Sequence, residues 1–119
     1  MICNQTLFNV TDNSGAKLVK CFKIPKYFNT DIGTMVYVVV KKVKNSQKLK
    51  EGIVIKGMVV RTKFVFDRLS GNFINFNTND VILVNNKEEL LCTRVFGPLI
   101  LELRKKQKVR ILSIGSKIL

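Results

Sequence analysis

Hydrophobic residues along this chain of 119 residues gather in short runs that favour strands over helices. β-Branched and aromatic side chains dominate the runs, and Gly, Asn, Asp and Ser separate them. The pattern predicts strands over residues 6–10, 16–24, 35–43, 53–62, 73–76 and 81–84. Turn-forming residues at 12–15 and 69–72 predict two tight connections, because their side chains can bond to the local backbone and their glycines tolerate positive φ.

The long strands are apolar almost throughout and do not alternate cleanly between apolar and polar positions. This is typical of a small closed barrel with one face covered, and the close spacing of short strands favours the same architecture. We therefore expect one mainly β domain over residues 1–119. It would be a barrel of roughly five to six strands with a protruding basic β-hairpin.

One short helical segment is predicted near the C-terminus. Pro98 follows Gly97 and suits a first helical turn, where no backbone N–H is needed. Residues 99–106 continue the helix, with Glu102 and Lys106 spaced to pair four residues apart. Residues 109–114 then return to a strand-like composition.

The positive charge of the chain indicates what kind of partner it binds. The chain carries 21 basic and 8 acidic residues, a net +13. Residues 13–63 contain twelve basic residues and only two acidic ones, Asp31 and Glu51, which gives this segment a net charge of +10. Such self-repulsion favours a polyanionic partner, with nucleic acid first and an anionic membrane surface second. The longest purely apolar stretch, residues 35–40, is too short to span a bilayer, so we expect a soluble domain.

The lysine-rich loop at residues 41–50 has two interpretations. Charge on an exposed hairpin improves solubility and blunts strand edges. The surrounding strands favour the second interpretation, contact with RNA or DNA, because further cations there would join the loop in one positive field. These cations are Lys17, Lys20, Lys23 and Lys26 before the loop, and Lys56, Arg61 and Lys63 after it.

Candidate chemistry is sparse, and we expect neither an enzyme nor a cofactor. Histidine is absent, and the adjacent Glu88 and Glu89 fit a solvated loop better than an acid/base pair. No phosphate-binding glycine motif occurs. Cys3, Cys21 and Cys92 lack any CxxC spacing, so reduced thiols in or near the core are favoured over a metal site.

Aromatic residues leave an alternative open. Phe64, Phe66, Phe73 and Phe76 could stack on bases, as in single-strand binders. Their spacing favours core packing, with Phe66 and Phe73 facing each other across a hairpin. Tyr27 and Phe28 are better placed, in a loop beside Lys26, to touch a base or a protein.

Three motifs in register identify a family resemblance. Residues 9–17 (NVTDNSGAK), 59–63 (VVRTK) and 93–98 (TRVFGP), followed by ELR at 102–104, resemble the universal large-subunit ribosomal protein L fourteen family along the whole chain. The resemblance implies a small β-barrel with a short C-terminal helical segment, seated on large-subunit rRNA at the face toward the small subunit. It also implies neighbours of the L three and L nineteen types, a bridge to small-subunit rRNA, and in many members a ribosome-silencing factor.

Site residues follow from the resemblance together with the charge pattern. The expected RNA contacts are Lys17, Lys20, Lys41, Lys44, Lys48, Lys50, Lys56, Arg61, Lys63, Arg94 and Arg104. The expected subunit-interface or partner residues are Thr93, Arg94, Phe96, Gly97, Pro98 and Arg104. Lys17 stands where many members have Arg, which keeps the charge but loses the planar fork for bidentate phosphate binding.

Several positions depart from the family pattern. Residues 24–33 form a shorter segment without the paired arginines, Thr34 replaces an Asp, Leu101 takes an often basic place, and the residues 115–119 differ from the usual ending. These changes set residues 24–33 and the bridge surface apart from the family pattern.

Residue usage bears on origin. A single alanine, with abundant Lys, Asn, Ile and Phe, is typical of an AT-rich genome. We therefore expect a mitochondrial, organelle-encoded member, with a plastid or the bacterial cytoplasm as alternatives. The N-terminus resembles no transit peptide, so the chain would be made where it works.

Two rival functions remain. A free single-strand binder of the oligonucleotide-binding barrel type predicts exposed phenylalanines, and a peripheral membrane protein predicts an amphipathic apolar patch outside the core.

Overall fold

The computed structural model describes residues 6–23, 32–44, 50–63, 65–67, 70–85, 87, 89–91, 94–100, 112–113 and 115–119. Within them the chain forms β1 (Leu7–Val10), β2 (Ala16–Lys23), β3 (Met35–Val43), β4 (Val54–Arg61), β5 (Phe66–Asp67), β6 (Phe73–Ile74), β7 (Asp80–Val84), β8 (Val95–Leu99) and β9 (Gly115–Ile118). Six of these match the strands predicted from the sequence to within a few residues.

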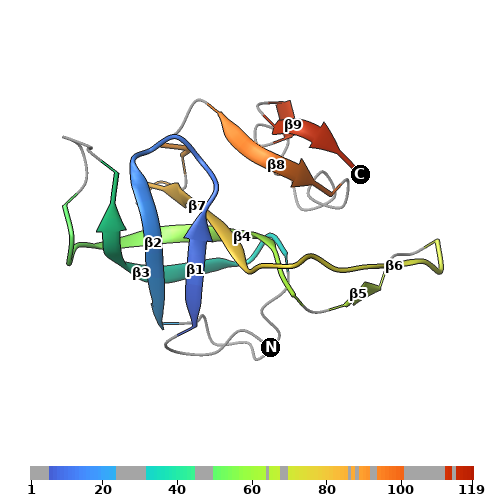
Figure 1. The fold of residues 1–119 in the computed structure, drawn as a ribbon, viewed down its shortest axis with the longest axis horizontal. Coiled ribbons are helices and arrows are strands. Elements are labelled where there is room, and N and C mark those ends of the chain that lie inside the picture. Colours follow the sequence, from blue (N-terminus) through green and yellow to red (C-terminus); the bar gives the residue numbers. More distant parts are fainter. Residues whose placement is uncertain are drawn as a thin grey trace.

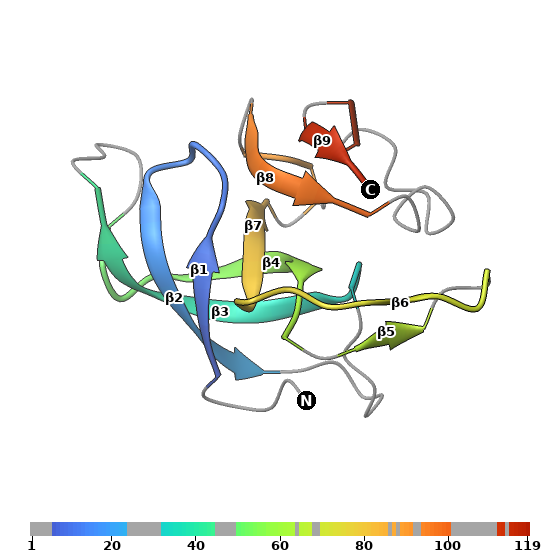
Figure 2. The same ribbon diagram turned by 45° about the vertical axis from the view of Figure 1, so that its right-hand side comes forward.

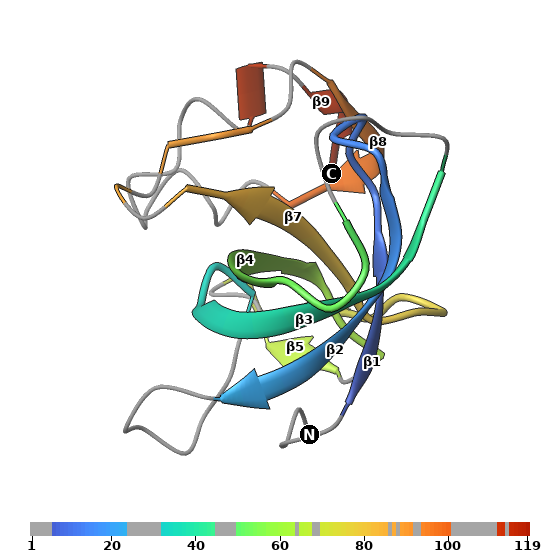
Figure 3. The same cartoon turned by 90° about the vertical axis from the view of Figure 1, so that its left-hand side faces the viewer.

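A closed barrel of five strands, in the order β1-β2-β3-β4-β7, forms the body of the molecule (Figures 1 and 3). The first four strands meander in antiparallel fashion, and β4 also pairs with β7 in antiparallel fashion. A parallel pairing of β1 with β7 closes the barrel. This confirms the mainly β barrel expected from the sequence.

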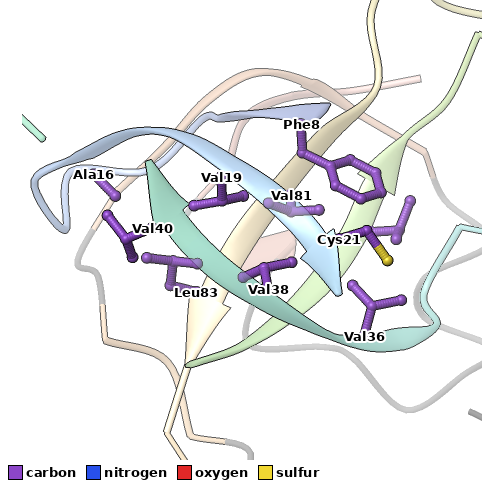
Figure 4. Close-up of a cluster of buried hydrophobic side chains, with 10 residues drawn as sticks. Phe8, Ala16, Val19, Cys21, Val36, Val38, Val40, Val81 and Leu83 are labelled. Atoms are coloured by element: carbon purple, nitrogen blue, oxygen red, sulfur yellow. The ribbon is translucent and has the colours of Figure 1, made fainter. Parts of the chain in front are cut away.

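The barrel interior is a core of small and β-branched side chains. Phe8, Val19, Cys21, Val38 and their neighbours point into it from all five strands (Figure 4). β3 alternates, with Val36, Val38 and Val40 buried while Tyr37 faces outward. Because a narrow five-stranded barrel leaves room only for compact side chains, valine suits these positions.

A second core lies outside the barrel, against β4 and β7. Met58, Val60 and Ile82 on these strands pack with Val95, Leu99, Ile100 and Leu112. This wall is therefore buried on both faces, which explains why all five residues of β7 are buried and why its sequence does not alternate. The covered face inferred from the continuous apolar runs is confirmed for β7 and for β4 from residue 57 onward, whereas the start of β4 and the outer side of β3 are open.

The C-terminal region differs from its prediction. Pro98 and Leu99 do not start a helix but belong to β8, which pairs in parallel with β9. Leu112 and Ser113, expected in a strand-like stretch, are helical. Residues 101–111, most of the predicted helix, lie outside the described residues. In the described part of the chain no helix is long and apolar enough to cross a membrane.

The hairpin that extends visibly from the body is β5–β6 (Figures 1 and 2). Gly71, at φ +89°, lies in its turn, where the sequence predicted a tight connection. The basic loop predicted to protrude at residues 41–50 is described only at its ends, since residues 45–49 lie outside the described residues.

Candidate nucleic-acid interface

Two lysines lie at irregularities in the β2–β3 ladder. Ala16 pairs with Val43, Leu18 with Lys42 and Val19 with Val40, so Lys17 on β2 and Lys41 on β3 each lack a residue directly opposite. An extra residue of this kind is a β-bulge, which twists the strand and re-aims side chains. Both lysines are exposed. The sheet thus presents two predicted RNA contacts at one end of the β2–β3 pair.

The outer side of β2, β3 and β4 carries further cations among apolar and aromatic side chains. We define the outer face as Lys20, Phe22, Tyr37, Val39, Val54 and Lys56. Cross-strand pairing sets Lys20 beside Val39, Val39 beside Val54, and Tyr37 beside Lys56. The Lys56 ammonium lies 5.7 Å from the centre of the Tyr37 ring, within the range of a cation–π contact.

The ends of the lysine loop continue this positive surface. Lys44 is exposed, and its backbone N–H donates to the Gly15 carbonyl at 2.7 Å, which ties the loop to the start of β2. Lys50 is exposed on the other side of the loop. Lys48 lies outside the described residues, so its expected RNA contact stays a prediction.

Arg61 is placed differently from the other predicted RNA contacts. It lies at the end of β4 and is only 7% exposed. Its Nε donates to Asp80 Oδ2 at 2.6 Å in a buried ion pair, and Thr78 donates to the same carboxylate oxygen at 2.8 Å. Its Nη1 donates to the carbonyls of Phe96 at 3.0 Å and Pro98 at 2.8 Å. The guanidinium therefore joins β4, β7 and β8 in the interior.

Lys63 and Arg94, by contrast, have exposed side chains. The backbone N–H of Lys63 donates to Asn79 Oδ1 at 2.9 Å, so the backbone is fixed while the ammonium faces solvent. The backbone N–H of Arg94 donates to Asn13 Oδ1 at 3.3 Å.

The turn at residues 12–15 fixes β8 from the other side. Asp12 is 6% exposed and accepts hydrogen bonds from the Ser14 N–H and hydroxyl and from the Leu83 N–H. Thr11 O accepts from the Phe96 N–H at 2.6 Å, and Asp12 forms a β-bridge with Val95. The three motifs that carry the family resemblance therefore meet at the junction between the barrel and β8.

The expected subunit-interface residues lie partly on β8. Phe96 is 52% exposed, while Gly97 and Pro98 are half-buried. Gly97 has φ +80°, and a Cβ there would lie 2.5 Å from Arg61 Nη1. Thr93 and Arg104 lie outside the described residues.

The aromatic predictions have mixed outcomes. Phe76 packs against the second core, as expected, but Phe73 is 69% exposed. The expected Phe66–Phe73 pair is wrong, because Phe66 pairs with Ile74 and Phe73 with Asp67. The register is therefore one residue away from the one that would set the two phenylalanines directly opposite each other. Phe64, Tyr27 and Phe28 lie outside the described residues.

In the part of the chain that the structure describes, cysteine and metal chemistry add no site. Cys21 is fully buried in the barrel core, as expected for a core thiol, while Cys3 and Cys92 lie outside the described residues. Among the residues that the structure describes, no cluster of His, Cys, Asp or Glu could hold a metal ion.

Sequence reasoning missed the two buried carboxylates, Asp12 and Asp80. Both stand next to strongly apolar strands, and each serves backbone or guanidinium donors from a distant strand. The available signal was an acid beside a buried run, which indicates a paired or capping role rather than a solvated one.

Comparison with known proteins identifies the same family as the three sequence motifs. The family model described as "Ribosomal protein L14p/L23e" matches residues 1–119. The chain is 42% identical over 124 residues to the large ribosomal subunit protein uL14 of Carsonella ruddii (strain PV), with the whole of both chains covered. That relative is bacterial, so it does not support the mitochondrial origin expected from residue usage. The chain belongs to the ribosomal protein L14p/L23e family.

Proposed function

We propose that this structural constituent of the large ribosomal subunit binds rRNA with the outer face and the adjoining lysines of its barrel. We further propose that β8 forms part of the surface turned toward the small subunit. The family is a structural one, and we propose no catalytic step.

The distribution of charge over the two sides of the barrel carries the proposal. The second core covers β7 and the part of β4 from residue 57 onward, whereas the open side carries Lys20 and Lys56 on its face and Lys17 and Lys41 at its bulges. The ion pair of Arg61 with Asp80 is interior. Phosphates can bind the lysines of the open side, and the counterions released on binding favour the complex.

The proposed contacts in the described chain are therefore exposed or half-exposed cations. They are Lys17, Lys20, Lys41, Lys44, Lys50, Lys56, Lys63 and Arg94. Lys48 and Arg104 join them from the sequence alone. These side chains would position the protein on the RNA backbone without reading base sequence.

Partners at the subunit face are proposed from the family resemblance and the exposure of β8. Phe96 and Arg94 are presented to solvent there. We propose contact with neighbouring proteins of the L three and L nineteen types, a bridge to small-subunit rRNA, and docking of a silencing factor. The ribosome would be of the bacterial type, in a bacterial cytoplasm or an organelle.

A salt titration of RNA binding tests the proposal. The purified chain and a Lys20→Ala/Lys56→Ala double variant are bound to transcribed large-subunit rRNA at rising salt. We expect the slope of log K against log salt to fall by about 1 to 2 in the double variant, because each lost phosphate contact removes about 0.7 to 0.9. Lys87→Ala, an exposed lysine outside the proposed set, is the matched control. An unchanged slope in the double variant would remove the outer face from the RNA interface.

A further inference from the structure

We propose that Arg61 is a positioning residue: it contacts no RNA but holds β8 in the conformation that presents Phe96 and Arg94. The inference rests on the proposed function for the role of that surface, and on hydrogen bonds for the role of Arg61.

The Arg61 guanidinium is bonded to β7 through one nitrogen and to β8 through another. Asp80 fixes Nε from β7, and Thr78 fixes the same carboxylate. Nη1 then bonds two carbonyls of β8, those of Phe96 and Pro98, which lie two residues apart. Five donors in a rigid plane allow arginine to serve such divergent acceptors, whereas lysine offers one compact ammonium.

β8 has a bulge at the residues whose carbonyls accept hydrogen bonds from Arg61. Val95 pairs with Gly115 and Pro98 with Lys117, so β8 has one more residue than β9 between these pairs. Gly97 lies in this bulge with φ +80°. Nη1, Cζ and Nη2 of Arg61 would lie 2.5, 3.0 and 3.1 Å from a Cβ at this position. Glycine is thus required both by its conformation and by the closeness of the guanidinium.

Phe96 is the side chain that the Arg61 hydrogen bonds hold toward solvent. Its N–H donates to Thr11 O, its carbonyl accepts from Arg61, and its side chain is 52% exposed. The backbone is held on both sides while the ring faces solvent. A fixed backbone with a projecting aromatic ring lowers the entropy lost when a partner docks.

The accessible cation of the same motif is Lys63, not Arg61. Arg61 is 7% exposed with Nε and Nη1 engaged, whereas the Lys63 side chain is exposed two residues later. A phosphate reaching Arg61 would have to displace Asp80 or the β8 carbonyls.

Hydrogen exchange of the full chain, followed by NMR, tests the positioning role. Variants Arg61→Lys, Arg61→Met and Gly97→Ala are compared with Gly71→Ala, whose glycine has φ +89° but open space around it. We expect the Phe96 amide to exchange at least tenfold faster in the three test variants, while barrel amides such as that of Val38 keep their protection. Gly71→Ala should leave Phe96 unaffected. If Gly97→Ala and Arg61→Met leave the Phe96 amide protected, the proposal is overturned.

A double variant tests whether the effect of Gly97→Ala arises from its contact with the Arg61 guanidinium. In Arg61→Met/Gly97→Ala the new methyl group no longer meets a guanidinium, so the added effect of Gly97→Ala should be smaller than in the native background. Full additivity would contradict the proposed contact. Because Gly97→Ala removes neither Arg61 nor Asp80, it leaves no buried charge without a counter-charge and remains informative even where Arg61→Met unfolds the whole chain.

Two functional readouts distinguish this inference from the proposed function. If Arg61 contacts RNA instead, Arg61→Met lowers the salt slope of rRNA binding and Arg61→Lys restores it. We expect neither change. Large subunits reconstituted with Gly97→Ala should associate with small subunits at least fivefold more weakly. Faster exchange at Phe96 with unchanged association would leave the positioning role standing and overturn the proposed place of β8 at the subunit interface.

Discussion

The carboxylate of Asp12 accepts a hydrogen bond from the backbone N–H of Leu83 at 2.9 Å, joining the first turn of the chain to the last strand of the barrel. The other oxygen of the same carboxylate bonds Ser14 and so shapes the turn itself. One side chain therefore sets both the local turn and its place against a strand 71 residues away.

Asp12→Ala should destabilise the fold by about 1 to 3 kcal/mol, because it leaves the buried Leu83 N–H without its acceptor. Urea unfolding followed by circular dichroism measures the change. Asn75→Ala, at an exposed residue away from this turn, is the control and should stay within about 0.5 kcal/mol. Equal effects of the two variants would contradict a special role for Asp12.

Asp80→Asn should cost about 3 to 5 kcal/mol of unfolding free energy, since it leaves the buried Arg61 guanidinium without a counter-charge. Glu51→Gln makes the same chemical change on an exposed side chain and should be nearly neutral. Combined with Arg61→Met, Asp80→Asn should lose much of its effect. Strict additivity in that double-mutant cycle would show that the pair is not coupled.

Leu83→Ala should cost about 2 to 5 kcal/mol, because Leu83 is fully buried in the barrel core and the cavity cannot collapse. Val54→Ala, on the outer face and 55% exposed, should change stability by less than about 1 kcal/mol. Thermal unfolding of both variants checks the assignment of inner and outer positions. A larger loss for Val54→Ala would mean that the outer face is covered by protein.

Phe73→Ser should leave stability within about 0.5 kcal/mol of the parent, because this ring is 69% exposed on the β5–β6 hairpin. Phe76→Ser, in the second core, should cost about 2 kcal/mol. We also expect Phe73→Ser to bind an unstructured RNA oligonucleotide as the parent does. A fivefold loss there would instead favour the single-strand binder that an exposed phenylalanine predicts.

The barrel could be predicted from sequence because its strands have strong local character. β3 was predicted to the residue, at Met35–Val43, since a run of valines between polar turns leaves little ambiguity. β8 was missed, because its Gly97 and Pro98 are poor strand formers and resemble a helix start. That strand depends on Arg61 and Thr11, which are distant in sequence, and tertiary contacts override local propensity.

The exposure of the candidate RNA-contact lysines could be predicted from their charge and their strand positions, whereas their contact with RNA stays a prediction. Lys17, Lys20, Lys41 and Lys56 are accessible on the open side of the barrel, as their strand positions suggested. Arg61 could not be separated from them, because its burial depends on Asp80 and on a bulge between Val59 and Arg61 in the β4–β7 register. A bulge of this kind leaves no clear mark in the sequence.

The parallel pairing of β1 with β7 also sets an order of events during synthesis. β1 to β4 can form their meander as they are made, but both of its edges stay open until β7 arrives to pair with β4 and β1 together. Such a long-range closure is slow compared with local hairpins. Until then the growing chain presents two unpaired strand edges, a state prone to aggregation. The excess of lysine on β2 and β3 would keep such unfinished chains apart by mutual repulsion, before any RNA is bound.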